Sequence, residues 1–275
     1  MLLAKASFSV DGQFYATAEL LGGVETGAHR SGCSLTADQL QHYDKDGFLV
    51  LDHVIDAAAI AEIRAAIARM IAQYSLPNEN LFDACIRLNQ ENDKALYNVY
   101  RVSHQTSAMN RLREQCRQVV EQVMPKDTGV LIDVDSHIIF CIPDSTRLTW
   151  GWHQESTYDV FDGNGVNFCL PIFERATREN GSMSVLRGSH VMGKLPFDTV
   201  REHENGATTL VPKRIEEFER EFEEVVFEAD PGSVVMFNRH LIHRSNHNRS
   251  PRPRITAVIR FMQIETLPES FEKPY

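Results

Sequence analysis

The pattern of apolar residues changes at Pro125, and this change constrains the fold more than any other feature of the chain. Before Pro125, apolar residues recur three and four positions apart, which is the spacing of one helix face. After it, short β-branched runs alternate with turn clusters. Helices followed by many short strands favour a mainly β fold, an antiparallel sandwich or jelly roll, with N-terminal helices packed on its outer face. The runs lie at 130–142, 166–173, 182–186, 225–228, 233–237 and 255–264.

The helical half divides into recognisable segments. Thr36 and Gln39 have the spacing of a capping box, so a short helix is expected to begin there and to end at Gly47. A longer helix is expected after Asp56, a good N-cap residue, and another should end at Pro125. The segment 89–104 between these two helices shows no clear period, so we expect a loop there, a candidate for the substrate entrance.

The length of the chain bears on its domains and on the role of any metal. A chain of 275 residues buries enough surface to fold without a disulfide or a metal, so a metal found here is expected to be functional. Residues 36–275 are predicted to form a single domain. Residues 1–35, which contain several glycines without a period, are predicted to be an extended or loosely ordered arm.

Composition excludes several classes of partner. The chain has 28 basic and 38 acidic residues, a formal net charge of −10, which argues against a nucleic acid or an anionic membrane bound by a basic surface. Five scattered cysteines without a CxxC pair are typical of free thiols in the cytoplasm. No segment reaches the roughly 18 apolar residues of a membrane helix. A cytoplasmic monomer or homodimer acting on a small molecule is expected.

Three residues with metal-binding side chains stand near strands. His153 and Glu155 are two apart, so on a strand their side chains point the same way and can bind one ion together. A second histidine must come from a distant strand, and the segment after the 233–237 run offers His240 and His243. These two cannot both face inward on an extended strand, and His243 is favoured.

Arg254 follows His243 by 254 − 243 = 11 residues, across a loop rich in Ser, Asn and Pro. If the two strands form a hairpin, both residues lie at the same end of the sheet. Two histidines and one carboxylate leave coordination positions open, the pattern of non-heme Fe(II) oxygenases. A nearby guanidinium suits a dicarboxylate cosubstrate. Asp135 and His137 share one face of a predicted strand, and contact with substrate or cosubstrate is left open for both.

Four segments together resemble the phytanoyl-CoA dioxygenase-like branch of the Fe(II)- and 2-oxoglutarate-dependent oxygenases. The resemblance covers about residues 36–264. It is carried by the opening HYDKDGFLVL (42–51), the metal motif WHQE (152–155), the middle signature RENGSM with RGSH (178–190), and the stretch from Pro231-Gly232 to Arg254.

This resemblance implies a double-stranded β-helix in which His153, Glu155 and His243 ligate Fe(II). Arg254 and Ser245 are then expected to bind the far carboxylate of 2-oxoglutarate, with O₂ as the second cosubstrate and ascorbate as the reductant in vitro. The family's carboxylate is more often Asp, so Glu155 is one methylene longer than usual. Many members also carry a Lys before the proline of the preceding strand, where this chain reads Cys141-Ile142-Pro143.

The expected activity is hydroxylation, desaturation or cyclisation at an unactivated C–H bond of a small-molecule metabolite or natural-product intermediate, with release of succinate and CO₂. The acidic composition gives no support for a CoA thioester as substrate. The alternative is a non-catalytic metal-binding jelly roll that binds a small anion or a sugar.

Overall fold

The structure is a computed structural model that describes residues 5–8, 14–17, 34–124, 129–134, 136–145, 149–159, 163–201 and 208–264. The chain divides into two units, residues 1–31 and 32–275. In the first unit, strands β1 (Lys5–Phe8) and β2 (Phe14–Thr17) pair antiparallel. The expectation of an arm over 1–35 and one domain over 36–275 stays a prediction.

The N-terminal helices begin where the sequence predicts. Thr36 and Gln39 form both hydrogen bonds of a capping box at the start of α1, and Gly47 ends it with a left-handed backbone. The Asp56 side chain caps α2. None of the described helices has the length and apolar character needed to cross a membrane. The helices are α1 (Ala37–Asp46), α2 (Ala57–Ala72), α3 (Leu81–Glu91), α4 (Asp93–Ser103), α5 (Ser107–Val123) and α6 (Ile215–Glu221).

The loop expected at 89–104 is wrong, because this segment contains the end of α3 and the whole of α4. The pattern hides α4 because its buried stripe is narrow, consisting of Ala95, Leu96 and Val99. Asn92 ends α3 and directly precedes α4, so no turn cluster separates the two helices. The hydroxyl of Ser103, at the end of α4, accepts a 3.1 Å hydrogen bond from the Ile138 amide and so ties α4 to the β-sheet.

Among the described residues, six strands form the larger sheet, and every pairing in it is antiparallel. Its longest pairing joins β6 to β13, from Thr256 opposite Pro171 to Ile264 opposite Gly163. The predicted run 130–142 is two strands, which pair with opposite ends of β13. The order is β3 (Phe48–Leu51), β11 (Val234–Asn238), β6 (Gly163–Pro171), β13 (Arg254–Ile264) and β4 (Val130–Asp133), with β5 (His137–Cys141) also on β13.

A smaller sheet has the order β10 (Glu224–Val226), β7 (Met183–Leu186) and β12 (His243–Ser245), and β8 (Phe197–Arg201) pairs with β9 (Thr208–Pro212). The hairpin expected between His243 and Arg254 is therefore wrong, since β12 pairs with β7 whereas β13 belongs to the larger sheet. The loop between them crosses from one sheet to the other. Asn248 holds this loop by donating to the carbonyls of Cys141 and Arg252.

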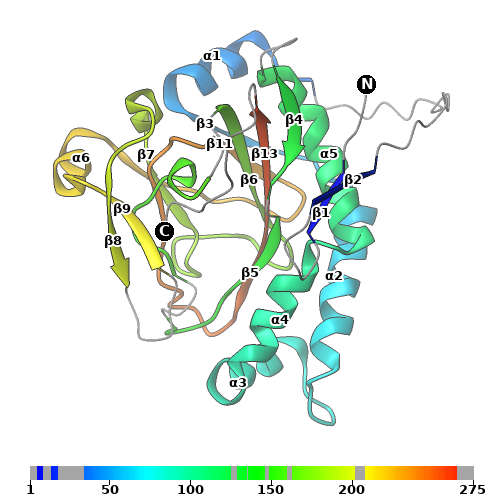
Figure 1. The fold of residues 1–275 in the computed structure, drawn as a ribbon. Helices are drawn as coiled ribbons and strands as arrows, with labels where there is room; N and C mark the ends of the chain where they lie inside the picture. The colour runs from blue at the N-terminus through cyan, green and yellow to red at the C-terminus, as the bar shows by residue number, and fades with distance from the viewer. Residues whose placement is uncertain are drawn as a thin grey trace. The chain divides into compact units, whose positions relative to one another are not determined.

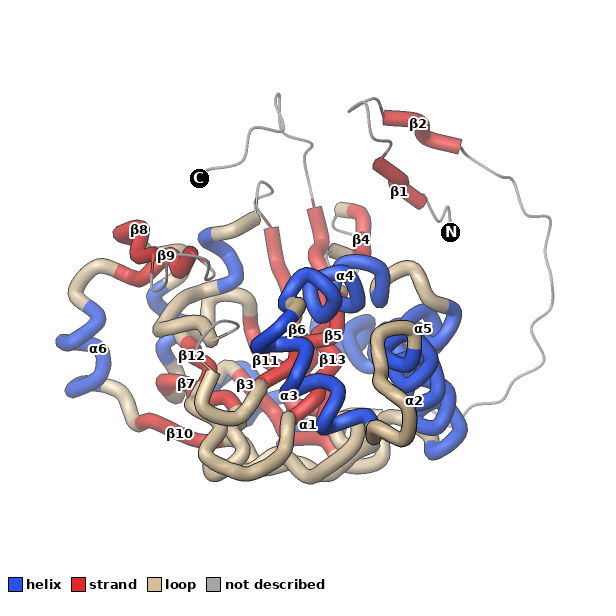
Figure 2. Tube along the Cα trace, turned by 90° about the horizontal axis from the view of Figure 1, so that it is seen from below, coloured by secondary structure: helices blue, strands red, loops and turns tan. Residues whose placement is uncertain are grey.

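The two faces of the larger sheet pack against different partners. Helices α2, α4 and α5 lie on one side of it, and α6 with the β8–β9 hairpin lies on the other, in both views (Figure 1, Figure 2). Side chains of the helices and of the outer sheet face form one apolar core. A second apolar cluster, including Phe48, Val185, Val235 and Phe237, fills the space between the larger and smaller sheets. The predicted mainly β fold with outer helices is confirmed.

Candidate metal centre

His243 is brought into the interior by the turn that joins β11 to β12. β11 ends at Asn238, whose carbonyl accepts from the Leu241 amide, and β12 begins at His243. The imidazole is 4% exposed. Its Nδ1 lies 2.9 Å from the Leu241 carbonyl, so the chain just before β12 fixes the orientation of the ring.

His153 lies directly beside His243 through a backbone bridge. Each amide donates to the carbonyl of the other residue, at 2.9 and 3.0 Å, and the ring centroids are 4.1 Å apart. Glu155 does not continue a strand, as the sequence suggested, but begins a single 3₁₀ turn, Glu155–Thr157. Gln154 points away from both residues, as expected, and its side-chain amide donates hydrogen bonds to the carbonyls of Gly193 and His240.

The three side chains converge on one point. The Oε1 atom of Glu155 lies 3.8 Å from Nε2 of His153 and 3.4 Å from Nε2 of His243. One ligand atom from each of the three buried residues lies within 4.8 Å of the others. Nδ1 of each histidine faces a carbonyl, which can only accept, so Nδ1 carries the proton and Nε2 keeps a lone pair for a metal.

The charges at this centre also suit a divalent metal. Burial alone raises the pKa of the Glu155 carboxyl, but the Arg260 guanidinium and the two imidazoles outweigh burial and hold this pKa well below its ordinary value. Burial, together with the neighbouring His153, lowers the pKa of His243. An ionised carboxylate beside a neutral imidazole is the form in which both residues ligate a metal. This donor set fits the 2-His-1-carboxylate pattern of non-heme iron.

Arg254 lies at the first position of β13, buried to 7% exposure. Its guanidinium donates to the carbonyls of Asn180 and Gly181 and to the hydroxyl of Thr256. Ser245 is the last residue of β12, two positions after His243, and its amide donates to the Trp150 carbonyl. Arg254 and Ser245 thus lie on strands of different sheets, and the strand of Ser245 also carries His243.

Other residues singled out from the sequence take different places. His240 lies in the turn after β11, outside the group of three, where its amide donates to the side chain of Asn238. His137, on β5, is 3% exposed, and its ring lies 4.2 Å from that of Tyr100 on α4. Asp135 lies outside the described residues. Tyr100, from the segment 89–104, therefore contacts β5 from a helix and not from a loop.

Two arginines near the centre were not singled out from the sequence. Arg260, on β13, donates to Glu155 Oε1 at 2.9 Å. Arg239 pairs with Asp159 at 3.0 Å, and burial raises the pKa of Asp159 to about 6, although Arg239 opposes this rise. A signal for Arg260 existed, because residues an even number of positions after Arg254 on one strand point to the same side.

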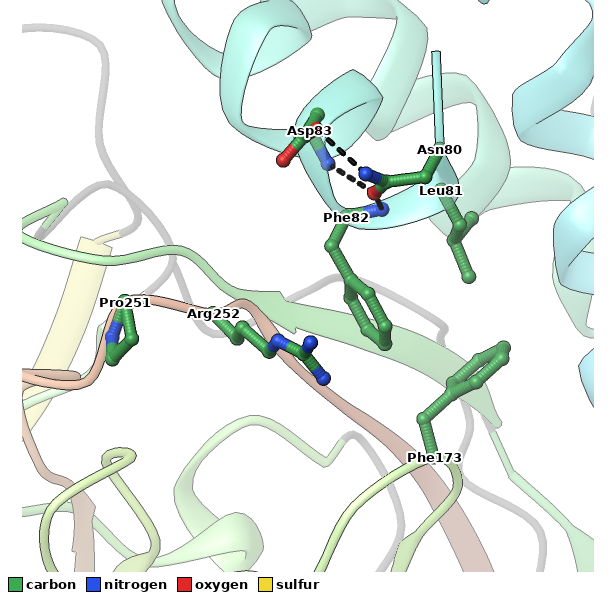
Figure 3. Close-up of a pocket in the computed structure, with 7 residues that line it drawn as sticks. All are labelled: Asn80, Leu81, Phe82, Asp83, Phe173, Pro251 and Arg252. Carbon is green, nitrogen blue, oxygen red and sulfur yellow. Dashed lines mark hydrogen bonds between the residues drawn. The ribbon is translucent and has the colours of Figure 1, made fainter. Parts of the chain in front are cut away.

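A surface hollow of about 650 Å³ lies elsewhere, at the start of α3. Figure 3 shows Phe82, Phe173 and Arg252 facing one another across it. Arg252 pairs with Glu174 there at 2.8 Å, and its side chain is 62% exposed. None of the residues lining this hollow belongs to the His–Glu–His group, so the hollow is separate from the metal centre.

Known proteins resemble this chain in sequence. A protein-family model described as phytanoyl-CoA dioxygenase (PhyH) matches residues 43–256. A protein named ectoine dioxygenase from Nocardia farcinica is 25% identical over 252 residues, which cover 86% of this chain and 82% of the relative.

Two solved structures share the fold. EvdO2 from Micromonospora carbonacea complexed with 2-oxoglutarate has a TM-score of 0.60 at 18% identity, covering 87% of this chain and 95% of that one. EctD from S. alaskensis with bound Fe has a TM-score of 0.53 at 19% identity, covering 87% and 80%. The described sheets therefore form the predicted jelly roll.

Proposed function

Because this chain belongs to the phytanoyl-CoA dioxygenase family, and is a non-heme iron dioxygenase that uses 2-oxoglutarate and O₂, we propose that it oxidises an unactivated C–H bond of a small-molecule metabolite or natural-product intermediate. The products are the hydroxylated, desaturated or cyclised substrate, succinate and CO₂. The observation that carries this proposal is the convergence of two imidazole Nε2 atoms and one carboxylate oxygen inside the jelly roll.

In this proposal His153, Glu155 and His243 hold Fe(II). When bound, the iron with 2-oxoglutarate and O₂ supplies the oxidative decarboxylation and the oxidation of the substrate C–H bond. The two imidazoles and the carboxylate are buried, at 7%, 4% and 8% exposure, so the protein fixes their geometry and keeps bulk water away. Three protein ligands leave the remaining coordination positions open for cosubstrate and O₂.

Arg254 and Ser245 are proposed to bind the far carboxylate of 2-oxoglutarate. Within the described residues, three of the five N–H groups of Arg254 donate to protein oxygens, which leaves two for a carboxylate. The same three hydrogen bonds hold the guanidinium in one orientation before the cosubstrate arrives. Preorganised donors of this kind bind a planar carboxylate in a bidentate manner.

A small polar substrate suits the surroundings of the centre. Arg260 contacts Glu155 there, Asn167 lies opposite Arg260 on β6, and relatives named ectoine dioxygenase act on a small molecule. The alternative of a non-catalytic jelly roll receives no support from the relatives. The absence of a nucleic-acid partner, the cytoplasmic location, and the monomeric or dimeric state stay predictions from composition.

The test is turnover of 2-oxoglutarate by the iron-loaded protein with ascorbate. We expect succinate and CO₂ release that rises when a metabolite library contains the substrate, and mass spectrometry should find a product with one oxygen gained or two hydrogens lost. The His243→Ala variant is the matched control and should give neither. If the iron-loaded protein consumes no 2-oxoglutarate with any library member, the proposed function is wrong.

A further inference from the structure

The carboxylate of the proposed centre is carried by a glutamate, which has one more rotatable bond than an aspartate. That bond must be fixed if the carboxylate is to keep one position relative to the two imidazoles, because each free rotor costs binding free energy when a ligand immobilises it. Glu155 also sits on a single 3₁₀ turn, which gives it less support than a strand in a sheet. Some other group must therefore hold its end.

Arg260 contacts the oxygen of Glu155 that faces the two imidazoles. Its Nη2 donates to Glu155 Oε1 at 2.9 Å, and Oε1 is also the atom that faces Nε2 of His153 and of His243. The side chains of Arg260 and Glu155 are 19% and 10% exposed, so water screens this pair little. A carboxylate oxygen has two lone pairs and can accept from Arg260 while still facing the imidazoles.

The backbone of Arg260 is held on both sides. Its carbonyl accepts from the Val134 amide at 3.0 Å, and across the other edge it stands opposite Asn167 of β6. Arg260 is 260 − 254 = 6 residues after Arg254, so both side chains leave the same face of β13, about 20 Å apart along the strand. A central strand of the larger sheet thus fixes the guanidinium more firmly than a loop would.

We propose that Arg260 is a positioning residue, whose guanidinium holds Oε1 of Glu155 against His153 and His243 so that the longer carboxylate ligates the iron. The inference rests on the proposed ligand set. Arg260 compensates for the extra methylene of Glu155, so the need for it should disappear when the carboxylate is shortened.

Iron affinity tests this directly and needs no substrate. Fe(II) is titrated anaerobically into the metal-free protein, and the charge-transfer band with saturating 2-oxoglutarate gives a second readout. We expect Arg260→Gln to weaken Fe(II) binding by about 10- to 100-fold, the usual loss when a group that orients a metal ligand is removed. Arg260→Lys should lose less, since an ammonium keeps the charge but reproduces the fork only in part.

The matched control is Arg175→Gln, which removes another guanidinium–carboxylate pair, that of Arg175 with Asp230, on the protein surface. It should leave Fe(II) affinity unchanged. Unchanged affinity in Arg260→Gln, within about twofold, would overturn the inference. If Arg260→Gln does not fold, Arg260→Lys is judged in its place by the same twofold limit.

The second arm repeats the substitution in a Glu155→Asp background. The shorter carboxylate withdraws from Arg260, so there Arg260→Gln should cost less than about threefold in Fe(II) affinity. Equal losses in both backgrounds would show that Arg260 only supports the fold and would overturn the inference. Failure of the ligand set itself is distinguished by His243→Ala, because that variant would then keep its Fe(II) affinity.

Discussion

The two faces of β13 carry side chains of different kinds. On the outer face Ile255, Ala257 and Ile259 belong to the apolar core formed with the helices. Arg254 and Arg260 alternate with these residues along the strand and therefore lie on the inner face. Each donates a hydrogen bond to a group far away in sequence. Burial alone does not distinguish the faces, since Arg254 and Ile255 are both buried. At these positions the faces differ in whether the side chain packs by apolar contact or is held by directed polar bonds.

We expect the outer face to determine stability and the inner face to determine what the centre binds. Apolar burial on the outer face contributes to stability roughly in proportion to area, and its loss lowers the free energy of unfolding. Polar groups on the inner face contribute little net stability because their desolvation offsets their bonds. They should instead control what the centre binds. Substitutions on the two faces should therefore change different measurements.

The largest effect is expected from removing a metal ligand. His243→Ala should abolish Fe(II) binding and 2-oxoglutarate turnover, because only one imidazole and the carboxylate remain to hold the ion. The fold should survive, since a core of this size does not depend on a metal. Anaerobic Fe(II) titration and thermal unfolding of the metal-free protein check both parts. If His243→Ala lost the folded state together with the iron, the expected separation of stability from metal binding would be wrong.

The opposite pattern is expected on the outer face at Phe168, which is fully buried and packs edge-to-face on Phe261 at 6.0 Å. Phe168→Ala should lower the free energy of unfolding by about 3–5 kcal/mol, the usual cost of removing a buried phenyl ring. Fe(II) affinity of the protein that remains folded should not change. Urea unfolding and Fe(II) titration test this, and a parallel loss of iron affinity would contradict it.

On the inner face Arg254→Ala should raise the 2-oxoglutarate requirement and leave Fe(II) affinity largely unchanged. Breaking one side of a buried bidentate ion pair costs about 3–5 kcal/mol, or roughly two to three and a half decades in binding. Arg254→Lys should recover part of it. The matched control is Arg252→Ala, because Arg252 is exposed and pairs with Glu174. Should the charge-transfer band disappear in Arg252→Ala and persist in Arg254→Ala, the cosubstrate arginine is wrongly assigned.

Sequence patterns predicted what is local or periodic. Thr36 with Gln39 and the Asp56 cap fixed helix starts, because capping depends on residues three apart. Of the two candidate histidines, His243 lies in the group with His153 and Glu155, whereas His240 falls in the turn after β11. The strands β8 and β12 lie outside the predicted runs.

Contacts between the sheets could not be predicted in the same way. The pair of Arg260 with Glu155 joins positions 105 residues apart, and it depends on the register of β13 against β6. The loop after β12 was taken for a hairpin because its composition is that of a turn, yet Asn248 ties it to the end of β5 instead. Composition indicates where the chain turns, whereas packing decides which sheet the following strand joins.

The smallest effects are expected from two conservative substitutions at adjacent positions of β13, Ile255→Val and Thr256→Val. Ile255→Val removes one methylene from the outer core and should cost about 0.5–1.5 kcal/mol of stability, with no change in 2-oxoglutarate affinity. Thr256→Val keeps the shape but removes the hydroxyl that accepts from Arg254. The guanidinium then loses one of its three protein anchors, and a hydrogen bond of about 1 kcal/mol corresponds to roughly fivefold weaker cosubstrate binding. Urea unfolding and anaerobic 2-oxoglutarate titration of both variants decide the matter, because equal cosubstrate affinities would mean that Thr256 does not orient Arg254.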